Sequence, residues 1–372
     1  MTHFHFITAV WGAAYTELFL EVVLPNQLSA GNLLYFRDKR QCATYKIYTA
    51  AADVERLQRS RSYAKLAEVV PVEIVLLDNV DLGRKYEALT ECHRRAIRAA
   101  DAAGAALVFL SPDAIWPDGT FKRLWQLAQA GTRVVMVGSI RVVKETFAPE
   151  YLARHFSESS CSAGVPARDL VKLAMGHLHP LTQALFWDSD HFGSGPSHLY
   201  WRVGDDGILA RCFHLHPLMV NPLVRGLLPS STIDADYTPL ACPDPESLYV
   251  VEDSDEIAGF EISAYSQFGT FKPRKFSAID TAFYARYWTQ SHHRKFVRHP
   301  IRFHGSDLTA QWQEIERQSA KVLETVELYL RFPAVFLAWK IMGRAARKTL
   351  KVLLLPFLGR AGVERLKRRL TN

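Results

Sequence analysis

The sequence predicts a Rossmann-like α/β fold, in which a mostly parallel sheet is covered by helices on both faces. Strand-like and helix-like segments alternate through the first 140 residues. The strand-like segments are continuous apolar runs rather than alternating patterns, as expected for strands that are buried on both sides. The overall composition, with 48% hydrophobic and 22% charged residues, is typical of a globular chain.

The predicted strands of this N-terminal half cover residues 4–10, 45–49, 72–77, 105–110 and 133–138. Apolar residues recur at helical spacing between them, over 15–23, 52–66, 85–103 and 121–130. Pro25, Gly104 and Gly131 mark helix ends. Because ligands of such sheets bind where parallel strands end, the segments that follow these strands are the first candidates for a functional site.

Beyond residue 150 the alternation is less regular. Residues 169–183 and 308–330 have helical patterns, whereas 199–203, 207–220 and 248–251 are predicted strands. Loops are predicted at 155–168 and 188–197, and residues 221–247 are irregular and rich in proline. Residues 264–312 are aromatic and basic and give mixed signals.

The net charge of +7 is concentrated at the C-terminal end of the chain. Residues 340–372 contain ten Lys and Arg residues and one Glu, so this segment carries +9 and the rest of the chain carries −2. A nucleic-acid-binding domain is expected to carry its basic patch on the fold itself, so we expect no nucleic-acid partner. The five cysteines are scattered and include no C-x-x-C pair, which favours free thiols in a reducing compartment.

Several catalytic and nucleotide-binding motifs are missing from the sequence. No G-x-G-x-x-G follows the first strand and no G-x-x-x-x-G-K-[ST] is present, which removes the main support for dinucleotide-binding and P-loop folds. No H-E-x-x-H or G-x-S-x-G occurs either. The function therefore has to be inferred from less standard patterns.

The most informative local unit is residues 96–138, in which a helix rich in Arg and Ala leads into a strand that ends at Ser111-Pro112-Asp113. A second helix and a second apolar strand follow. This unit resembles the centre of nucleotide-sugar glycosyltransferases of the A-type fold, where a strand ends in a short acidic motif. The opening segment Phe6-Ile-Thr-Ala-Val-Trp-Gly12 resembles the first strand of that family.

The resemblance implies a donor site at the ends of the first and fourth predicted strands. The donor-binding residues that it implies are Thr8, Ala9, Trp11, Gly12, Tyr15, Lys85, Tyr86 and Asp113. Asp113 would hold a Mg²⁺ or Mn²⁺ ion together with the donor diphosphate, because such hard cations prefer oxygen ligands. The family motif often has two acids, whereas this chain has one. The alternative is that Asp113 and Asp118 are turn residues before the next helix.

Further acids in predicted loops are candidates for the acceptor side. An inverting transferase needs a carboxylate base to take the proton of the acceptor hydroxyl, and Asp188 and Asp190 are the predicted catalytic residues. The other acceptor-side candidates are Asp234, Asp236, Asp255 and Glu256. The competing interpretation of each is an acidic residue of a surface turn.

His214 and His216 lie two residues apart in the predicted strand 207–220 and would share one face of it. Such a pair can chelate one metal ion, and the resemblance implies that a histidine of this region completes the metal shell. The alternative is a buried, hydrogen-bonded histidine beside a second one that packs at the strand end.

The resemblance divides the chain into a catalytic domain at 1–262, with a nucleotide-binding half at 1–150 and an acceptor half at 151–262. A basic, aromatic region with a helix follows at 263–330. Residues 331–372 form an amphipathic, basic tail with apolar residues at helical spacing, which predicts binding to an anionic membrane surface. No signal peptide and no uncharged apolar run of ~18 residues is present.

These features together predict a glycosyltransferase that is peripheral on the cytoplasmic face of a membrane. It would move a sugar from a nucleotide sugar to a surface-glycan or lipid-linked acceptor. Two alternatives remain at this stage. One is a metal-dependent hydrolase that uses His214, His216 and nearby aspartates, and the other is a membrane-recruited scaffold without catalytic activity.

Overall fold

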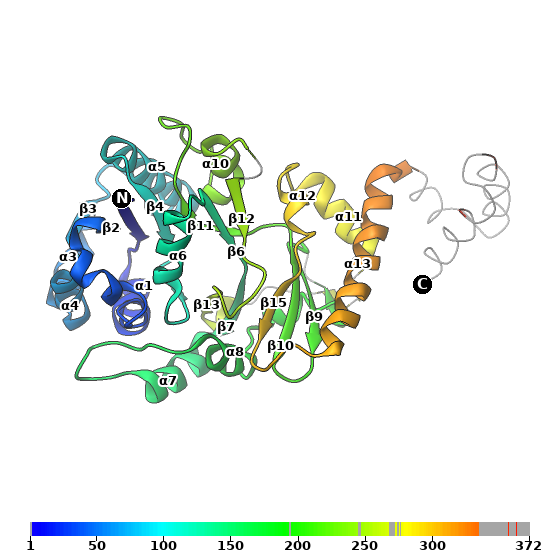
Figure 1. Ribbon diagram of the computed structural model, residues 1–372, viewed down its shortest axis with the longest axis horizontal. Helices are drawn as coiled ribbons and strands as arrows, with labels where there is room; N and C mark the ends of the chain where they lie inside the picture. Colours follow the sequence, from blue (N-terminus) through cyan, green and yellow to red (C-terminus); the bar gives the residue numbers. More distant parts are fainter. Residues whose placement is uncertain are drawn as a thin grey trace.

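The computed structural model describes residues 2–192, 195–244, 247–267, 272–273, 275, 277–334, 356 and 362 (Figure 1). Its centre is a seven-stranded sheet in the order β12-β6-β11-β4-β1-β2-β3. The strands are β1 (Phe4–Ala9), β2 (Ala43–Thr49), β3 (Val72–Leu76), β4 (Ala106–Leu110), β6 (Val134–Val137), β11 (His216–Val220) and β12 (Leu248–Val250). The predicted α/β fold with a mostly parallel sheet is therefore confirmed.

Most neighbouring strands of this sheet run parallel to each other. Strand β1 pairs in parallel with β2 and β4, β2 with β3, and β6 with β12. Strand β11 is the exception, because it lies antiparallel between β4 and β6. All five predicted N-terminal strands are present. The side chains of β1, β2, β4 and β6 are buried, as continuous apolar runs require, whereas those of the edge strand β3 are half-buried or exposed.

Helices connect these strands and pack against the sheet. They are α1 (Ala13–Leu18), the π-helical turn η1 (Phe19–Val23), α2 (Leu24–Gln27), the 3-10 segment η2 (Leu33–Cys42), α3 (Ala51–Arg59), α4 (Arg61–Val69), α5 (Lys85–Ala103) and α6 (Thr120–Gln129). The single helix predicted at 52–66 is wrong. Ser60 has extended backbone angles and separates α3 from α4, and its side chain accepts a hydrogen bond from the Tyr63 N–H as the N-cap of α4.

The second half adds three small sheets. They are β5 (Ala114–Ile115), β13 (Gly259–Ser263) and β7 (Ser139–Val143), then β15 (Ile301–His304), β10 (Gly207–Cys212) and β9 (His198–Val203), and finally β14 (Lys272–Pro273) with β8 (His191–Phe192). The helical elements are α7 (Lys144–His155), α8 (Ala167–Met175), α9 (Pro180–Gln183), α10 (Ile233–Ala241), η4 (Tyr265–Gln267), α11 (Ala278–Tyr287), α12 (His293–Phe296) and α13 (Ala310–Arg331).

Three predictions for this half are wrong. The predicted strand 207–220 is two strands in different sheets, because β10 pairs with β9 and β15 whereas β11 joins the central sheet. The predicted helix 169–183 is divided into α8 and α9 by a turn at 176–179. The irregular segment 221–247 contains α10, whose Pro239 did not prevent a helix because the first turns precede it.

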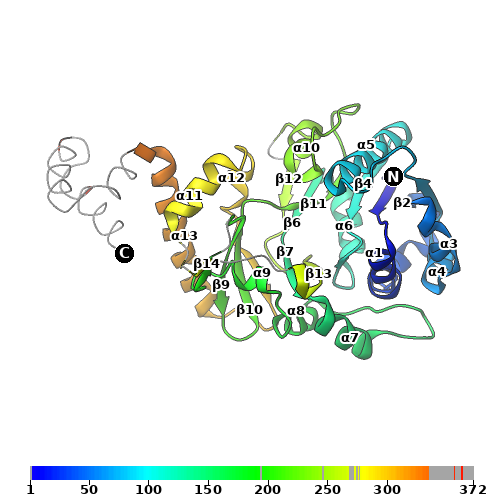
Figure 2. The ribbon, with the colours of Figure 1, turned by 180° about the vertical axis from the view of Figure 1, so that it is seen from behind.

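Two hydrophobic cores stabilise the fold. The larger one surrounds the central sheet, where the rings of Phe4, Phe36 and Trp125 pack edge to face. The smaller one lies between α13 and the sheet of β9 and β10, around Trp201 and Trp312. Figure 2 shows α13, β9 and β10 at the end of the described part of the chain that is opposite to α3 and α4. The predicted helix 308–330 is thus confirmed as α13, and β15 pairs with β10 across the predicted boundary at 262.

All five cysteines are buried thiols that form no disulfide. Among the residues that the structure describes, no helix combines the length and the hydropathy needed to cross a bilayer. The predicted amphipathic helix of the tail lies outside the described residues.

Candidate functional site

A cavity of about 530 Å³ lies at the carboxyl ends of β1 and β4. This is the edge where ligands bind in parallel α/β sheets. Its lining includes eight residues that the sequence singled out, which are Ala9, Trp11, Tyr15, Lys85, Tyr86, Asp113, His216 and Asp234. It also includes His93, Arg141 and Glu261, which the sequence did not single out. Ala9 and Glu261, which are 252 positions apart in the chain, therefore line the same cavity.

Asp113 reaches the cavity because β4 ends at Leu110 and the chain turns at Ser111 and Pro112 into the short strand β5. The Ile262 N–H donates to the Asp113 carbonyl over 2.7 Å, which holds this turn against β13. Burial raises the pKa of the Asp113 carboxyl to about 6, and the negative charge of Glu261 adds to the increase. A carboxylate in such surroundings gains free energy from a nearby cation.

Glu261 lies beside Asp113 because β13 pairs with β5, with Glu261 opposite Ala114. Its carboxylate accepts hydrogen bonds from the Ser139 hydroxyl at 2.7 Å, from Arg141 Nε at 3.1 Å and from Arg141 Nη2 at 2.5 Å. Burial favours a higher pKa for Glu261, but Arg141 and Ser139 outweigh it and hold the pKa below its ordinary value. The pair is therefore ionised, and Glu261 orients the Arg141 guanidinium toward the site.

Lys85, at the N-terminus of α5, is the second cationic side chain in the lining of the cavity, after Arg141. Its Nζ donates to the Tyr15 hydroxyl at 3.2 Å and lies 4.9 Å from the centre of the Tyr15 ring. Burial lowers the pKa of Lys85, but Tyr15 and Asp113 more than offset this, and the net pKa is raised. Gln267 Nε2 also donates to the Tyr15 hydroxyl, over 3.3 Å, so the ring is held from two sides.

The charges that line the cavity sum to a negative value near neutral pH. Lys85 and Arg141 supply two positive charges, whereas three carboxylates face them, those of Asp113, Asp234 and Glu261. Burial lowers the pKa of His216, and it lowers that of His93 to about 3, so both rings are neutral. The protein alone therefore contributes a net charge of −1 to this hollow.

His216 occupies a fixed orientation in this lining. Its Nε2 lies 2.7 Å from the Phe109 carbonyl oxygen, so Nε2 carries the proton and Nδ1 keeps a free lone pair. This is the tautomer arrangement that metal-binding histidines adopt. His214 does not accompany it, because residues 213–215 lie between β10 and β11 and the His214 ring packs 4.4 Å from the His293 ring. The expected pair on one strand face is therefore not formed.

Two of the predicted donor-binding residues lie outside the lining. The Thr8 hydroxyl is fully buried and hydrogen-bonded to the Tyr45 hydroxyl at 2.7 Å, because β1 turns this side chain toward the core. The Gly12 N–H donates to Asp53 Oδ2 over 2.8 Å, and its φ of 82° allows the tight turn from β1 into α1. Both residues therefore fix the backbone at the end of β1 through these hydrogen bonds. Their direct contact with a donor stays a prediction.

The predicted catalytic acids also lie outside the lining. Asp190 Oδ1 lies 3.6 Å from Lys275 Nζ, and both side chains are exposed near the β8–β14 pair. Asp188 precedes this pair in the same exposed segment. Among the acceptor-side candidates, Asp234 lines the cavity, whereas the Asp236 carboxylate accepts hydrogen bonds from Ser230. The catalytic role of Asp188 and Asp190 stays a prediction.

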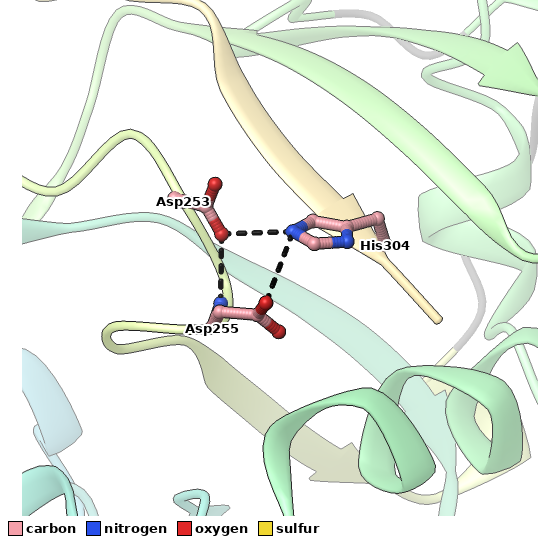
Figure 3. Close-up of side chains that lie close together, drawn as sticks. All are labelled: Asp253, Asp255 and His304. Carbon is pink, nitrogen blue, oxygen red and sulfur yellow. Dashed lines mark hydrogen bonds and ion pairs between the residues drawn. The ribbon is translucent and has the colours of Figure 1, made fainter. Parts of the chain in front are cut away.

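A second group of side chains could hold a metal ion. Among the residues that the structure describes, Asp253, Asp255 and His304 offer three ligand atoms within 4.8 Å of one another (Figure 3). These atoms already have partners. His304 Nε2 lies 2.8 Å from Asp253 Oδ1, and Arg168 donates to both oxygens of Asp255 at 2.9–3.1 Å.

This group connects the segment between β12 and β13 to β15, and we interpret it as a structural network rather than as a reaction centre. Asp255 therefore belongs to this network and not to the cavity. Glu256 lies beside it, where Arg123 Nε donates to its carboxylate over 2.8 Å and the Tyr249 hydroxyl donates to it over 2.8 Å. The metal-dependent hydrolase that the sequence left open would need His214 and His216 together, and the structure separates them.

Comparison with known proteins finds similarity at the level of structure. No family model matches the chain, and no curated protein sequence matches it. Among solved structures, the mannosyltransferase PcManGT of Pyrobaculum calidifontis, in complex with GDP-Man and Mn²⁺, matches with a TM-score of 0.36 and 12% identity, over 99% of this chain and 84% of that one.

Two further matches concern proteins of which this chain spans about half the length. TarS of S. aureus matches with a TM-score of 0.34 and 9% identity, over 96% of this chain and 49% of that one. Mouse xyloside xylosyltransferase 1 matches with a TM-score of 0.25 and 11% identity, over 41% of this chain and 59% of that one. The similarity to these structures is one of fold.

Proposed function

We propose that the protein is a nucleotide-sugar-dependent glycosyltransferase whose donor binds in the cavity at the ends of β1 and β4. The observation that carries this proposal is the meeting of Asp113, Lys85 and Arg141 with three aromatic residues in one hollow. Trp11, Tyr15 and Tyr86 can stack on a nucleobase. The two cations can bind a diphosphate, which is the leaving group of the transfer reaction.

A divalent cation fits this site because it would offset the negative charge that the cavity and a bound diphosphate have together. A diphosphate adds about two negative charges to a hollow that already carries −1, and a low-dielectric site makes such an excess costly. A Mg²⁺ or Mn²⁺ ion would be held by Asp113 together with phosphate oxygens and water, with His216 Nδ1 as a further ligand. When bound, the ion neutralises the charge that develops on the leaving diphosphate.

Arg141 and Lys85 assist the same step without the ion. One edge of the Arg141 guanidinium, formed by Nε and Nη2, is hydrogen-bonded to Glu261. The orientation of Arg141 is therefore set before the donor binds. Lys85 is held by the Tyr15 ring at the N-terminus of α5, where the helix dipole also favours an anion. Such preorganised groups lose little free energy to reorientation during the reaction.

The central experiment is a thermal-shift screen of nucleotides and nucleotide sugars with and without Mn²⁺. We expect a nucleoside diphosphate and its sugar to raise the melting temperature by several degrees only when Mn²⁺ is present, because ligand at a hundredfold excess over its Kd adds about 2.7 kcal/mol of stability. A shift that is equal without the metal would contradict the charge argument. If no nucleotide shifts the protein, the transferase proposal fails.

The base that activates the acceptor can be identified by three matched substitutions. Asp234 lines the cavity at the start of α10, and we propose it as the base, so we expect Asp234→Asn to lower kcat at least about a hundredfold while the nucleotide and Mn²⁺ still bind. Asp188→Asn and Asp190→Asn test the two acids predicted from the sequence, and we expect each to keep kcat within about threefold of the wild type because their carboxylates are exposed.

The measurement is the release of nucleoside diphosphate from the donor found in the screen, with a membrane extract as the source of acceptor. Loss of kcat in the Asp188 or Asp190 variant, with Asp234→Asn active, would reverse this assignment. Glu261 is a weaker candidate because three of its lone-pair positions are occupied by Ser139 and Arg141.

We propose that the enzyme acts at the cytoplasmic face of a membrane, where it transfers the sugar to a surface-glycan or lipid-linked acceptor. Support comes from the sequence of residues 331–372, in which a regular apolar stripe accompanies the excess of basic residues. Each Lys or Arg near an anionic bilayer contributes about 1 kcal/mol to binding. An acceptor carried by a lipid would meet the enzyme at the same surface.

A further inference from the structure

Helices α11, α12 and α13 lie together at one end of the described part of the chain (Figures 1 and 2), and this end carries exposed aromatic side chains. Helix α11 packs against α13, and its residues Thr281, Ala282 and Ala285 are buried. Phe283 and Tyr287 of α11, and Trp288 directly after its last residue, have exposed fractions of 46%, 66% and 76%. Large exposed aromatic side chains that gather on one helix indicate an interaction surface.

Two adjacent hollows continue this face. The first has a volume of about 130 Å³ and is mostly apolar, with Phe283, Tyr287 and Tyr329 in its lining. The second has a volume of about 210 Å³ and is lined by three arginines, Arg294, Arg298 and Arg331. Leu330 of α13 lines both hollows, so the aromatic and the basic parts are contiguous.

The charge of the face is positive. Besides the three arginines of the second hollow, Arg286 extends over the Tyr287 ring, 5.9 Å from its centre. The lining of the two hollows contains one acid, Glu327, which pairs with Arg298 at 2.9 Å. A face of aromatic rings beside arginines matches the interface of an anionic bilayer, where rings enter the headgroup region and guanidinium groups bind phosphate.

We propose that this α11–α13 face docks on an anionic lipid bilayer and orients the enzyme there. The inference rests on the proposed location at a membrane and adds a surface of the folded body to it. Pro333 and Ala334 line the first hollow, so residues 335–372, with their charge of +9, continue the chain directly from this face. The body and the tail would then bind the same membrane together.

Other occupants of the face are disfavoured by the same charges. Residues 335–372 carry +9 and would meet four arginines if they covered the face themselves. A second copy in a symmetric dimer would place the same arginines against one another. An anionic bilayer is the partner whose charge complements both the face and the tail.

The test is flotation of the full-length chain with vesicles of phosphatidylcholine and phosphatidylglycerol, and with vesicles of phosphatidylcholine alone. We expect the triple variant Phe283→Ser, Tyr287→Ser and Trp288→Ser to partition onto the anionic vesicles at least about tenfold less than the wild type, because three rings no longer leave water. The substituted side chains are exposed, so the fold is retained, and circular dichroism checks this.

A control variant removes three exposed apolar side chains elsewhere on the surface. Leu223, Val224 and Leu227 are exposed by 39–49% and lie after β11, in the loop that leads to α10. Their triple substitution to Ser should leave vesicle binding unchanged. A second measurement is quenching of tryptophan fluorescence by brominated lipid in the anionic vesicles, part of which should disappear in Trp288→Phe.

Three results would overturn the proposal. The α11 triple variant could float as well as the wild type while deletion of residues 335–372 abolishes flotation, which would assign binding to the tail alone. The control triple could lose as much binding as the α11 triple. Light scattering could instead show a wild-type dimer that the α11 triple converts to a monomer, which would assign the face to self-association.

The nucleotide screen separates this inference from the proposed activity. We expect the α11 triple variant to keep the Mn²⁺-dependent thermal shift of the wild type, because the face contains no residue of the cavity. If no nucleotide shifts either protein but the vesicle results hold, the transferase proposal fails and the membrane face stands.

Discussion

Asp113→Asn is expected to remove nearly all sugar transfer and, at the same time, to make the folded protein more stable. The loss of activity follows from the proposed role of the carboxylate in holding a divalent cation at the donor diphosphate. Removal of such a ligand is expected to lower kcat/KM at least about a hundredfold. The Mn²⁺-dependent thermal shift with nucleotide should disappear as well.

The gain in stability follows from the pKa of Asp113, which burial and Glu261 raise from an ordinary 3.8 to about 6. The folded state therefore holds the proton more tightly than the unfolded state, and ionisation at higher pH destabilises the fold. This penalty is absent below about pH 4, grows between about pH 4 and 6, and is complete above. Its upper limit is about 3 kcal/mol, from two pKa units at 1.36 kcal/mol each.

The measurement is urea denaturation of both proteins at about pH 4.5 and pH 7.5 without metal. We expect Asp113→Asn to gain about 2–3 kcal/mol at pH 7.5, where the penalty is complete, and to gain clearly less at pH 4.5, where only part of it is present. A less stable variant at pH 7.5 would contradict the raised pKa. Retained transfer activity would contradict the role in metal binding.

Asp118→Asn is the matched control, five residues further along the chain and after strand β5. The Asp118 carboxylate is exposed and accepts the Gly31 N–H at 2.6 Å, and it does not line the cavity. We therefore expect this variant to keep transfer activity and to lose a fraction of the roughly 1–3 kcal/mol that a hydrogen bond to a charged group contributes. The two substitutions should thus change stability in opposite directions.

Asn26→Ala is expected to cost about 3–5 kcal/mol of unfolding free energy, the largest effect on stability predicted here. The Asn26 amide is fully buried on α2. Its Nδ2 donates to the Trp116 carbonyl and to the Tyr151 hydroxyl, each over 2.9 Å, and its Oδ1 accepts the Trp116 N–H at 2.8 Å. Alanine would leave both backbone groups of Trp116 without a partner in the interior.

Urea denaturation at neutral pH measures this effect, and Gln126→Ala provides the control. Gln126 is an exposed amide on α6, so its replacement should change stability by no more than about 0.5 kcal/mol. A cost of less than about 1 kcal/mol for Asn26→Ala would show that water or a shifted chain satisfies Trp116. Trp116 follows the β5 strand that holds the Asp113 turn, so an accompanying loss of nucleotide binding is expected.

The elements of the N-terminal half were more predictable from the sequence than those of the second half. The five N-terminal strands were predictable because each is an apolar run whose burial is encoded in its own residues. Asp113 could be placed at the site because it directly follows such a strand. Breaks inside helices were less visible, and Ser60 was missed although a serine before a helical pattern is a known N-cap signal.

Glu261 and Arg141 carried no comparable signal. Each lies in a strand of five residues, in the segments Gly259–Ser263 and Ser139–Val143, and polar or charged residues interrupt the apolar run in both. They meet because β13 pairs with both β5 and β7. An acidic residue between Phe260 and Ile262 was the one local hint, since a charge in an apolar strand needs a partner.

The sequence by itself therefore determined the fold class, the position of Asp113 at a strand end, and the concentration of positive charge at the C-terminal end. These depend on residues that are close in the chain, because periodicity and composition are local. The tertiary structure alone decided that β11 enters the sheet antiparallel, that His214 and His216 separate, and that Glu261 and Arg141 join Asp113. These depend on pairing between distant segments, which is selected by the packing of the whole core rather than by any segment's own pattern.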